Sequence, residues 1–457
     1  MYRLRMPSFR LLFAAAALSA LAASPALGAW SAPEQASKGP LPARAPDVAV
    51  NARGDAAAAW VRGARREAMV VVSIRAAGGE WSAPEAISRR GRPAIDPEVV
   101  VDAQGRVTVV WRQVVRTRVV QTGSGRRRQA VYVVRTRDRA VADARWNRIA
   151  TLSSEKQKVG PPQVAVGDDG LAVATWHWGT GTKPGDRGYV GEVQFAERGA
   201  DGAWSGPGRL SRSALCAQVR LPHVAVGRSG DAVIWWQCDL PADRSTALAR
   251  VRTASGTFFG DEVELPFRTE GAVSADLAID GTGRAAAVSA DSTGTLSWWR
   301  GDVGSTLSLR ELPALGTPDR IDPAAGAVGP VIAVDDAGDA LSAWVDSGDR
   351  PRAAPIASDL GVGSASGLGP AGRSSSSPVV AVGGDRGGAV AWIADGRVLA
   401  SMRGGDGTLA TGSAVSSSGV PELDPPALAM DSSGDAELFW TRVSRGRSVI
   451  ERSSGTP

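Results

Sequence analysis

The chain has 457 residues, a formal net charge of +5 and 43% hydrophobic residues, with 55 glycines and 28 prolines. It exceeds one ordinary domain in length, and its hydrophobic content excludes a disordered chain, so several domains or one turn-dense repeat architecture are expected. Because the basic residues are almost all Arg, spread along the chain and alternating with Asp, the positive charge does not predict a nucleic-acid partner.

The N-terminus has the layout of a secretory signal peptide. Three arginines within the first ten residues precede an apolar run, and small residues continue to Ala29. The run is shorter than the roughly 20 residues that span a bilayer, so a membrane anchor is the weaker interpretation. We therefore assign residues 1–29 to a signal peptide, and expect residues 30–457 to form one domain of a secreted or periplasmic protein without a membrane span.

One segment recurs eight times, as in VIAVDDAGDALSAWV at residues 331–345. The apolar residue before its turn marks each copy, and these residues lie 48 to 65 positions apart: Val50, Val101, Val166, Val226, Ile279, Val334, Val382 and Met430. In seven copies a tryptophan follows ten residues later: Trp60, Trp111, Trp176, Trp236, Trp344, Trp392 and Trp440. Ser289 takes this place in the fifth copy. A spacing that stays fixed while the repeat length varies indicates a rigid element joined by variable loops.

Each copy is predicted to be a β-hairpin. Runs of alternating small and β-branched residues flank a turn such as 335–338, where Asp bonds its own backbone and Gly takes a positive φ. In the seventh copy Arg386 holds the Gly position, so its turn is predicted to shift by one. A third and a fourth apolar run follow, as at residues 69–75 and 80–88. Four antiparallel strands in a period of about 50 residues are typical of a propeller blade.

The two ends of the chain complement each other. The last copy stops after its third strand, at residues 447–453, and an isolated fourth strand, AWSAPEQAS, begins at Ala29. Joining that strand to the last blade gives every blade four strands and pairs edges that would otherwise favour aggregation. We therefore predict an all-β fold, an eight-bladed β-propeller of four-stranded antiparallel blades closed by the N-terminal strand, with an open array as the weaker alternative. The seven repeated tryptophans would then pack between blades.

The two cysteines, Cys216 and Cys238, flank the fourth hairpin. Cys238 should lie opposite residue 219, three positions from Cys216, so we predict a disulfide within this blade. Two thiols cannot form a zinc site by themselves, and the Asp-rich turns lack the ligand run of a calcium loop. We therefore expect no metal site and no cofactor.

The repeat P-x-V-A-V-D-x-x-G-x-A-x-A-x-W, with W-S-x-P-x-x-L-S, resembles the propeller repeats of uncharacterised exported bacterial proteins. It is distantly similar to sialidase-like and Asp-box propellers. The resemblance covers nearly all of residues 30–457 and implies a fold, not an activity. A retaining sialidase needs a Tyr/Glu pair and three substrate-binding arginines, but Tyr132 and Tyr189 fall in predicted third strands. Neither histidine, His177 or His223, suits a catalytic triad, so no catalytic centre is predicted.

Two groups of side chains are candidates for ligand binding. Trp178, Trp235, Trp298 and Trp299 have no place in the repeat, and they would either stack on sugars or add to the packing between blades. The insertion at residues 112–139 of the second copy carries nine arginines and one aspartate. There Arg126, Arg127 and Arg128 are expected in a Gly/Ser loop, where they would attract an anionic polymer or be merely solvated.

The sequence therefore predicts an exported, monomeric binding or interaction scaffold without catalytic activity. Its partner would be a cell-surface glycan, an anionic cell-envelope polymer or another protein. The alternative is a glycan-active hydrolase or lyase, sialidase-like, whose carboxylates lie around the central channel.

Overall fold

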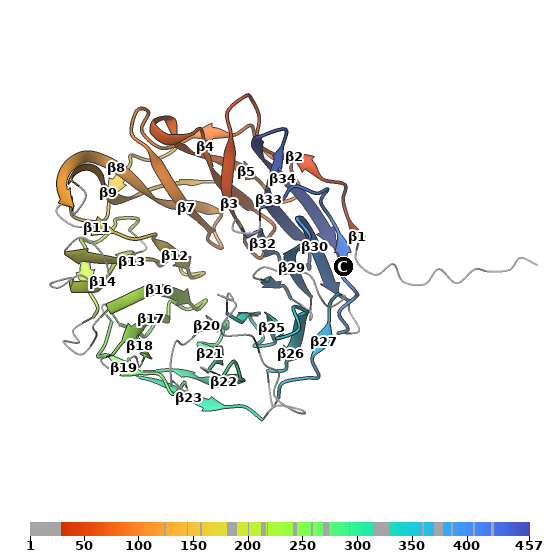
Figure 1. The fold of residues 1–457 in the computed structure, drawn as a ribbon. Helices are drawn as coiled ribbons and strands as arrows, with labels where there is room; N and C mark the ends of the chain where they lie inside the picture. The colour runs from red at the N-terminus through yellow and green to blue at the C-terminus, as the bar shows by residue number, and fades with distance from the viewer. Residues whose placement is uncertain are drawn as a thin grey trace, which may run out of the picture.

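The computed structural model shows eight antiparallel sheets arranged around a central axis (Figure 1). It describes residues 29–457 except 123–124, 144, 156–157, 181–189, 200, 212–215, 217, 241–244, 257–258, 268–273, 292, 305, 314–320, 322–328, 359–360, 370–377, 385–386, 405–406 and 422–424. The described residues include only Ala29 of the predicted signal peptide. The shifted turn expected at Arg386 also lies outside the described residues. The protein is an eight-bladed β-propeller, as the repeat predicts.

Each blade runs outward from the axis in chain order. The innermost strands are β3 (Ala43–Val50), β7 (Ala94–Val101), β11 (Lys158–Val159) with β12 (Gln163–Val166), β16 (Gln218–Val226), β20 (Ser274–Ile279), β24 (Val331–Val334), β28 (Val379–Val382) and β32 (Ala427–Met430). The second strands are β4 (Ala56–Arg62), β8 (Arg106–Thr122), β13 (Ala172–Thr180), β17 (Ala232–Asp239), β21 (Arg284–Ala290), β25 (Ala340–Val345), β29 (Gly388–Ala394) and β33 (Ala436–Ser444).

The outer half of each blade is less regular. The third strands are β5 (Met69–Arg75), β9 (Gly125–Ala140), β14 (Val190–Arg198), β18 (Ser245–Arg252), β22 (Leu296–Val303), β26 (Pro351–Ile356), β30 (Arg397–Arg403) and β34 (Arg447–Thr456). The fourth strands of blades one to seven are β6 (Glu85–Ala86), β10 (Ala150–Thr151), β15 (Gly208–Arg209), β19 (Val263–Glu264), β23 (Leu307–Glu311), β27 (Ser366–Gly367) and β31 (Ser413–Ala414). A short 3-10 helix, η1 (Arg65–Glu67), connects β4 to β5. Within the described ranges, no helix has the length and apolar character of a membrane span.

The chain ends close the ring. The fourth strand of the last blade is formed by β1 (Ala29–Trp30) and β2 (Glu34–Gln35), which both pair antiparallel with β34. Trp30 lies opposite Gly455, and the Ser31 amide donates a 2.8 Å hydrogen bond to the carbonyl of Ser454. Figure 1 shows β1 beside the C-terminus. The predicted pairing of the N-terminal strand with the last blade is confirmed.

The apolar residues of the repeat fill the spaces between blades. All seven repeated tryptophans are fully buried, with 0 or 1% of each side chain exposed. The alanines around them, such as Ala57 and Ala59 in β4, are also fully buried and let neighbouring blades approach closely. At the closure, Trp81 of blade one packs edge-on against Phe439 of blade eight, with ring centroids 5.2 Å apart. The last blade therefore packs against the first through the same kind of apolar core that joins the other neighbouring blades.

The inner hairpin turns also interlock around the ring. Asp335 accepts hydrogen bonds on Oδ1 from the amides of Ala337 and Asp339, both at 2.9 Å, which fixes the turn. The turn glycine takes a positive φ, +90° at Gly338. A Cβ atom added at Gly338 would lie 2.9 Å from Oδ2 of Asp280, in the turn of the preceding blade. Glycine is therefore required both for the φ angle and for the approach of a neighbouring carboxylate.

Replacement of this glycine should weaken the ring. Gly338→Ala adds a left-handed alanine and a close contact with Asp280, so we expect a loss of about 2 kcal/mol in the free energy of unfolding, measured in urea. Gly361→Ala, in the same blade, is the matched control because its Cβ would meet no atom within 4 Å. Equal stability of the two variants would show that the turns do not depend on this approach.

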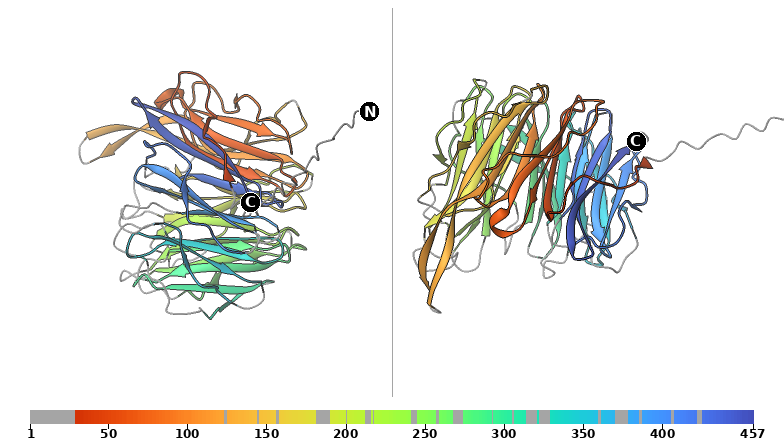
Figure 2. Two further views of the ribbon diagram at one scale, coloured as in Figure 1. Left: turned by 90° about the vertical axis from the view of Figure 1, so that its right-hand side faces the viewer. Right: turned by 90° about the horizontal axis from the view of Figure 1, so that it is seen from above.

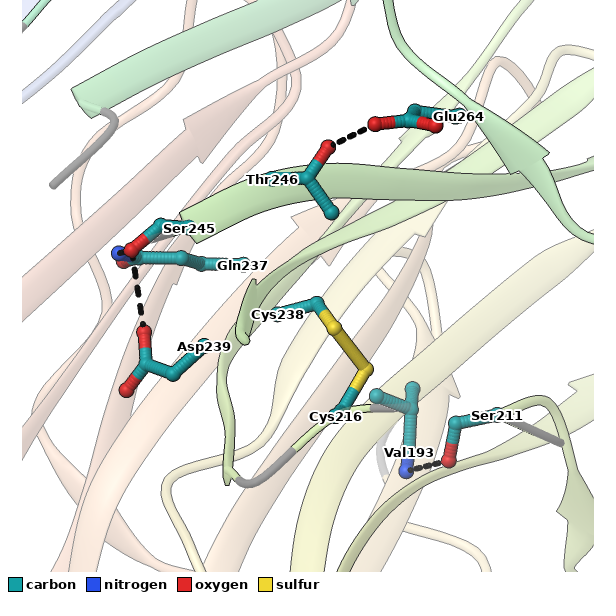
Figure 3. Close-up of a disulfide and its surroundings, with 9 residues drawn as sticks. All are labelled: Val193, Ser211, Cys216, Gln237, Cys238, Asp239, Ser245, Thr246 and Glu264. Atoms are coloured by element: carbon teal, nitrogen blue, oxygen red, sulfur yellow. Dashed lines mark hydrogen bonds between the residues drawn. A yellow bond between two sulfur atoms is a disulfide. The ribbon is translucent and has the colours of Figure 1, made fainter. Parts of the chain in front are cut away.

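The disulfide lies at the edge of the fourth blade (Figure 3). Val219 pairs with Cys238 across the β16–β17 hairpin, which is the register predicted from the sequence. Cys216 lies just before β16, with its Cα 5.2 Å from that of Cys238, and the two sulfur atoms are bonded. The bond closes a segment with a sequence separation of 22 residues and ties the start of β16 to the end of β17.

Removal of this bond should destabilise the protein. Cross-linking a segment of this length contributes about 3 kcal/mol by constraining the unfolded chain, so Cys216→Ser/Cys238→Ser should lose about that amount in urea unfolding. Reduced wild-type protein should behave like the variant. Alkylation of two thiols in unreduced, folded protein would contradict the disulfide.

Candidate functional site

The four tryptophans proposed as a sugar platform are buried. Trp178, Trp235, Trp298 and Trp299 are only 3 to 6% exposed and belong to the clusters between blades. Trp235 stacks on His223 at 4.3 Å, and the indole nitrogen of Trp299 donates a 2.9 Å hydrogen bond to Oγ of Ser289. Their absence from the repeat reflects local packing, because the fifth blade supplies indoles from its third strand where Ser289 replaces the usual tryptophan. The packing alternative is the one that the structure supports.

The arginine-rich insertion is a long two-stranded ribbon. Its strands β8 and β9 stay paired up to Thr122 and Gly125, and the ribbon projects beyond the rest of the molecule (Figure 2). Arg126 and Arg128 are exposed, and the placement of the Arg127 side chain lies outside what the structure describes. All three residues lie in β9 and not in a loop, because the pairing leaves only residues 123–124 between the strands. The loop expected at 126–128 is therefore corrected to a strand.

The central channel opens into a pocket where the innermost strands begin. Its volume is about 530 Å³. Its carboxyl groups come from two places on the ring: Asp47, Asp96 and Glu98 from blades one and two, and Asp276 from blade five. The other lining residues are apolar: Ala45, Pro46, Pro97, Pro161, Val331, Ile332, Val379, Val380, Pro425, Pro426, Ala427 and Leu428. We call this pocket the channel mouth; no Arg or Lys belongs to its described lining.

The repeat places the carboxyl groups of the channel mouth at one height. Asp47, Glu98 and Asp276 each lie three residues before the apolar residue that marks the copy. In blades six and seven, Val331 and Val379 hold the same position. The ring thus repeats the backbone, while the residue at this position is acidic in blades one, two and five and apolar in blades six and seven. Sequence analysis did not single out these carboxyl groups, although their shared position in the repeat was visible.

Irregular backbone positions two of the carboxyl groups. The pairing of β3 with β4 shifts between Arg44 and Asp47, and the pairing of β7 with β8 shifts between Ile95 and Glu98. Ala45 and Asp96, which precede prolines in these bulges, both have a φ of +52°. A left-handed φ is unfavourable at a residue other than glycine, and such strain is concentrated at functional sites.

The carboxyl groups also connect neighbouring blades. Oδ2 of Asp47 accepts a 2.6 Å hydrogen bond from the amide of Val99 in the next blade. Oδ2 of Asp276 accepts a 3.0 Å hydrogen bond from the amide of Ile332, again in the next blade. These bonds satisfy inner-strand amides at the channel, so each carboxyl group has a structural role beside any role toward a ligand.

Burial makes these groups weak acids. It raises the pKa of Asp47 to about 7 and that of Asp276 to about 6, although backbone amides partly oppose the effect. The pKa of Glu98 is raised well above its usual value by burial and by the charges of Asp47 and Asp96. Asp96 pairs with Arg112, whose Nε lies 2.5 Å from its Oδ2. The raised pKa favours the protonated form of Glu98, in which the carboxyl group can donate a hydrogen bond.

The two histidines give no site. Burial lowers the pKa of His223 to about 4, and its stacking on Trp235 accounts for its position. The pKa of His177 is also lowered by burial and by the nearby charge of Arg112. Among the residues that the structure describes, no group of three or more His, Cys, Asp or Glu could hold a metal ion.

Comparison with known proteins identifies the fold and no family. No protein-family model matches the chain, and no curated protein matches its sequence. A lectin from Burkholderia pseudomallei is similar in structure, with a TM-score of 0.51 and 12% identity, over 82% of this chain and 99% of the lectin. A protein of unknown function from Dyadobacter fermentans has a TM-score of 0.46 and 10% identity, over 94% and 99% of the two chains. A Hadza microbial sialidase has a TM-score of 0.44 and 13% identity, over 88% and 76%.

The structural likeness to the lectin, at this low identity, shows that the chain is a β-propeller and shows nothing of its ligand. The resemblance of the repeat to exported bacterial proteins stays a prediction.

The raised pKa of Asp276 predicts how stability depends on pH. Because the folded state binds this proton more tightly than the unfolded state, stability should fall as pH rises from about 4 to about 6. Asp276→Asn removes this titration, so the free energy of unfolding of the variant should rise relative to that of wild type between about pH 4 and about pH 6. Because water in the channel screens the charge, we expect a change on the order of 1 kcal/mol. Urea unfolding at a series of pH values measures the difference. A difference that does not change with pH would contradict the raised pKa.

Proposed function

We propose that the protein is a non-catalytic binding scaffold whose channel mouth takes an uncharged part of a glycan. The observation that carries the proposal is the mixed lining of this pocket, in which carboxyl groups lie among apolar side chains. Carboxyl groups such as Asp47 and Asp276 can bind sugar hydroxyls, while Val331 and Val379 can pack against the apolar face of a sugar ring. Its volume of about 530 Å³ suits a ligand of that size. The lectin with the same fold is compatible with this proposal.

The lining of the channel mouth argues against an anionic ligand there. A sialic acid or uronic acid carries a carboxylate, which arginine side chains usually bind. The described lining of the channel mouth contains Asp47, Asp96, Glu98 and Asp276 and no arginine. An uncharged sugar is therefore favoured over the substrate of a sialidase.

The hydrolase alternative rests on the unequal acidity of neighbouring carboxyl groups. Glycosidases use one protonated and one ionised carboxyl group at the reacting bond. Glu98 would be the acid, since its pKa is raised by burial and by Asp47 and Asp96, and Asp47 would be the base. Burial also raises the pKa of Asp47 to about 7, so no strongly ionised base lies beside Glu98, and binding without turnover is the preferred proposal.

The proposed place of action rests on the predicted signal peptide. If residues 1–29 direct export, the protein meets cell-surface glycans in the periplasm or outside the cell, where a disulfide such as that of Cys216 persists. The proposed protein is a secreted or periplasmic monomer. A glycan fits the channel mouth better than a protein partner does, because this pocket is concave and small.

A glycan array combined with chromogenic glycosides tests this function. We expect retention of uncharged glycans without turnover, and at least a tenfold loss of affinity in Asp47→Asn and Asp276→Asn, because each loses a charged acceptor for sugar hydroxyls. Asp302→Asn, at a side chain that is 85% exposed on β22, is the matched control and should bind like wild type.

Turnover that is abolished by Glu98→Gln would instead establish the hydrolase. Retention of glycans by the wild type with unchanged affinity in both channel-mouth variants would move the binding site elsewhere on the propeller.

A further inference from the structure

A second, smaller cavity lies at the base of the arginine-rich ribbon. It has a volume of about 150 Å³. Its lining consists of Arg89, Arg92, Gln113, Val114, Val115, Arg135 and Glu155. These residues come from the loop between blades one and two, from β8 and β9, and from the loop after β10. We call this cavity the arginine pocket.

The arginine pocket has excess positive charge. Its three arginines and Glu155 leave two positive charges, and none of the three forms a salt bridge within the described part of the chain. Arg135 is only 9% exposed, and a buried cation without an ionic partner is costly. Burial and the nearby charge of Arg89 lower the pKa of Arg135, and Glu155 opposes this effect only in part. Glu155 therefore compensates only part of the positive charge of the pocket.

Two buried polar side chains of the arginine pocket keep unused hydrogen-bonding groups. Arg135 donates from Nη1 to Oγ1 of Thr151, but its Nε has no hydrogen-bond partner. Gln113, 1% exposed, donates from Nε2 to the carbonyls of Arg89 and Arg92 at 3.3 and 3.2 Å, which leaves its Oε1 without a partner. Unpartnered buried polar groups call for a ligand or water: Nε of Arg135 can donate to an anion, whereas Oε1 of Gln113 is an acceptor and needs a water or a phosphate hydroxyl.

The backbone holds the arginine pocket in place. Arg92 donates from Nη1 to the carbonyl of Val115, which ties the interblade loop to β8. Gln113 fastens the same loop from the other side through the carbonyls of Arg89 and Arg92. An arginine fixed in this way loses little conformational entropy on binding an anion.

We propose that the arginine pocket binds a phosphate group, either free or as a monoester. A phosphate carries a charge of about −1.5 to −2 at neutral pH, which matches the two uncompensated positive charges. Its oxygens accept hydrogen bonds from guanidinium groups in the planar geometry that arginine provides. This site does not involve the channel mouth, so it is independent of the proposed glycan.

Titration calorimetry with inorganic phosphate at constant ionic strength tests the arginine pocket. We expect saturable binding of one phosphate, weakened about tenfold or more by Arg89→Ala and by Arg92→Ala, since each removes one charged donor. Arg90→Ala, in the same loop but outside the lining, is the matched control and should leave the affinity unchanged.

A variant that should bind phosphate more tightly distinguishes the loss of a ligand-binding group from misfolding. Glu155→Gln removes the one carboxylate of the arginine pocket and should tighten phosphate binding several-fold, which a folding defect would not do. Absence of saturable binding, or equal affinities of Arg89→Ala, Arg90→Ala and wild type, would overturn the proposal. Asp276→Asn, which changes the channel mouth and not the arginine pocket, should leave phosphate binding unchanged. The phosphate proposal can therefore fail or hold independently of the glycan proposal.

Discussion

The structure depends on the pairing of β1 and β2 with β34, because it gives the last blade its outer strand. An unpaired strand edge there would be open to association with other chains, and blade eight would pack against blade one as an incomplete sheet. With the pairing made, each blade has a neighbour on both sides, and the indole rings of the repeat are covered on both faces. The central channel and the pocket at its end exist only as properties of the closed ring.

Closure also explains how one repeated backbone produces an asymmetric site. Every innermost strand presents the same position to the channel, and the side chain found there differs from blade to blade, from Asp47 and Glu98 to Val331. Burying carboxyl groups is unfavourable for the fold, as their raised pKa values show. Two of these groups each satisfy an amide of the next blade, which offsets part of that cost. Within the described part of the chain, Glu98 makes no such bond to the next blade. Of the three groups, it is the one whose pKa neighbouring charges raise most, namely those of Asp47 and Asp96.

The fold and the disulfide could be predicted because they depend on spacing along the chain. The fixed interval from Val50 to Trp60 and its counterparts determines the hairpin register, and the same register brings Cys238 opposite Val219. The site could not be found in this way, because it depends on which strands meet across the ring. Trp298 was a candidate only because it lies outside the repeat, yet a residue without a repeated position can still be buried when its own blade lacks the repeated indole, as blade five does at Ser289. The arginine pocket likewise joins residues from two blades that no local pattern connects.

The location of the two chain ends in one blade has a consequence for the order of assembly. During synthesis, the strands that complete the last blade are made first, and their partner β34 is made after all the other blades. An unfinished chain therefore carries two open sheet edges, one at its beginning and one at its growing end, until translation is nearly over. Any factor that shields nascent chains would have to cover both of them, and a fusion placed directly before Ala29 would have to leave space beside β34.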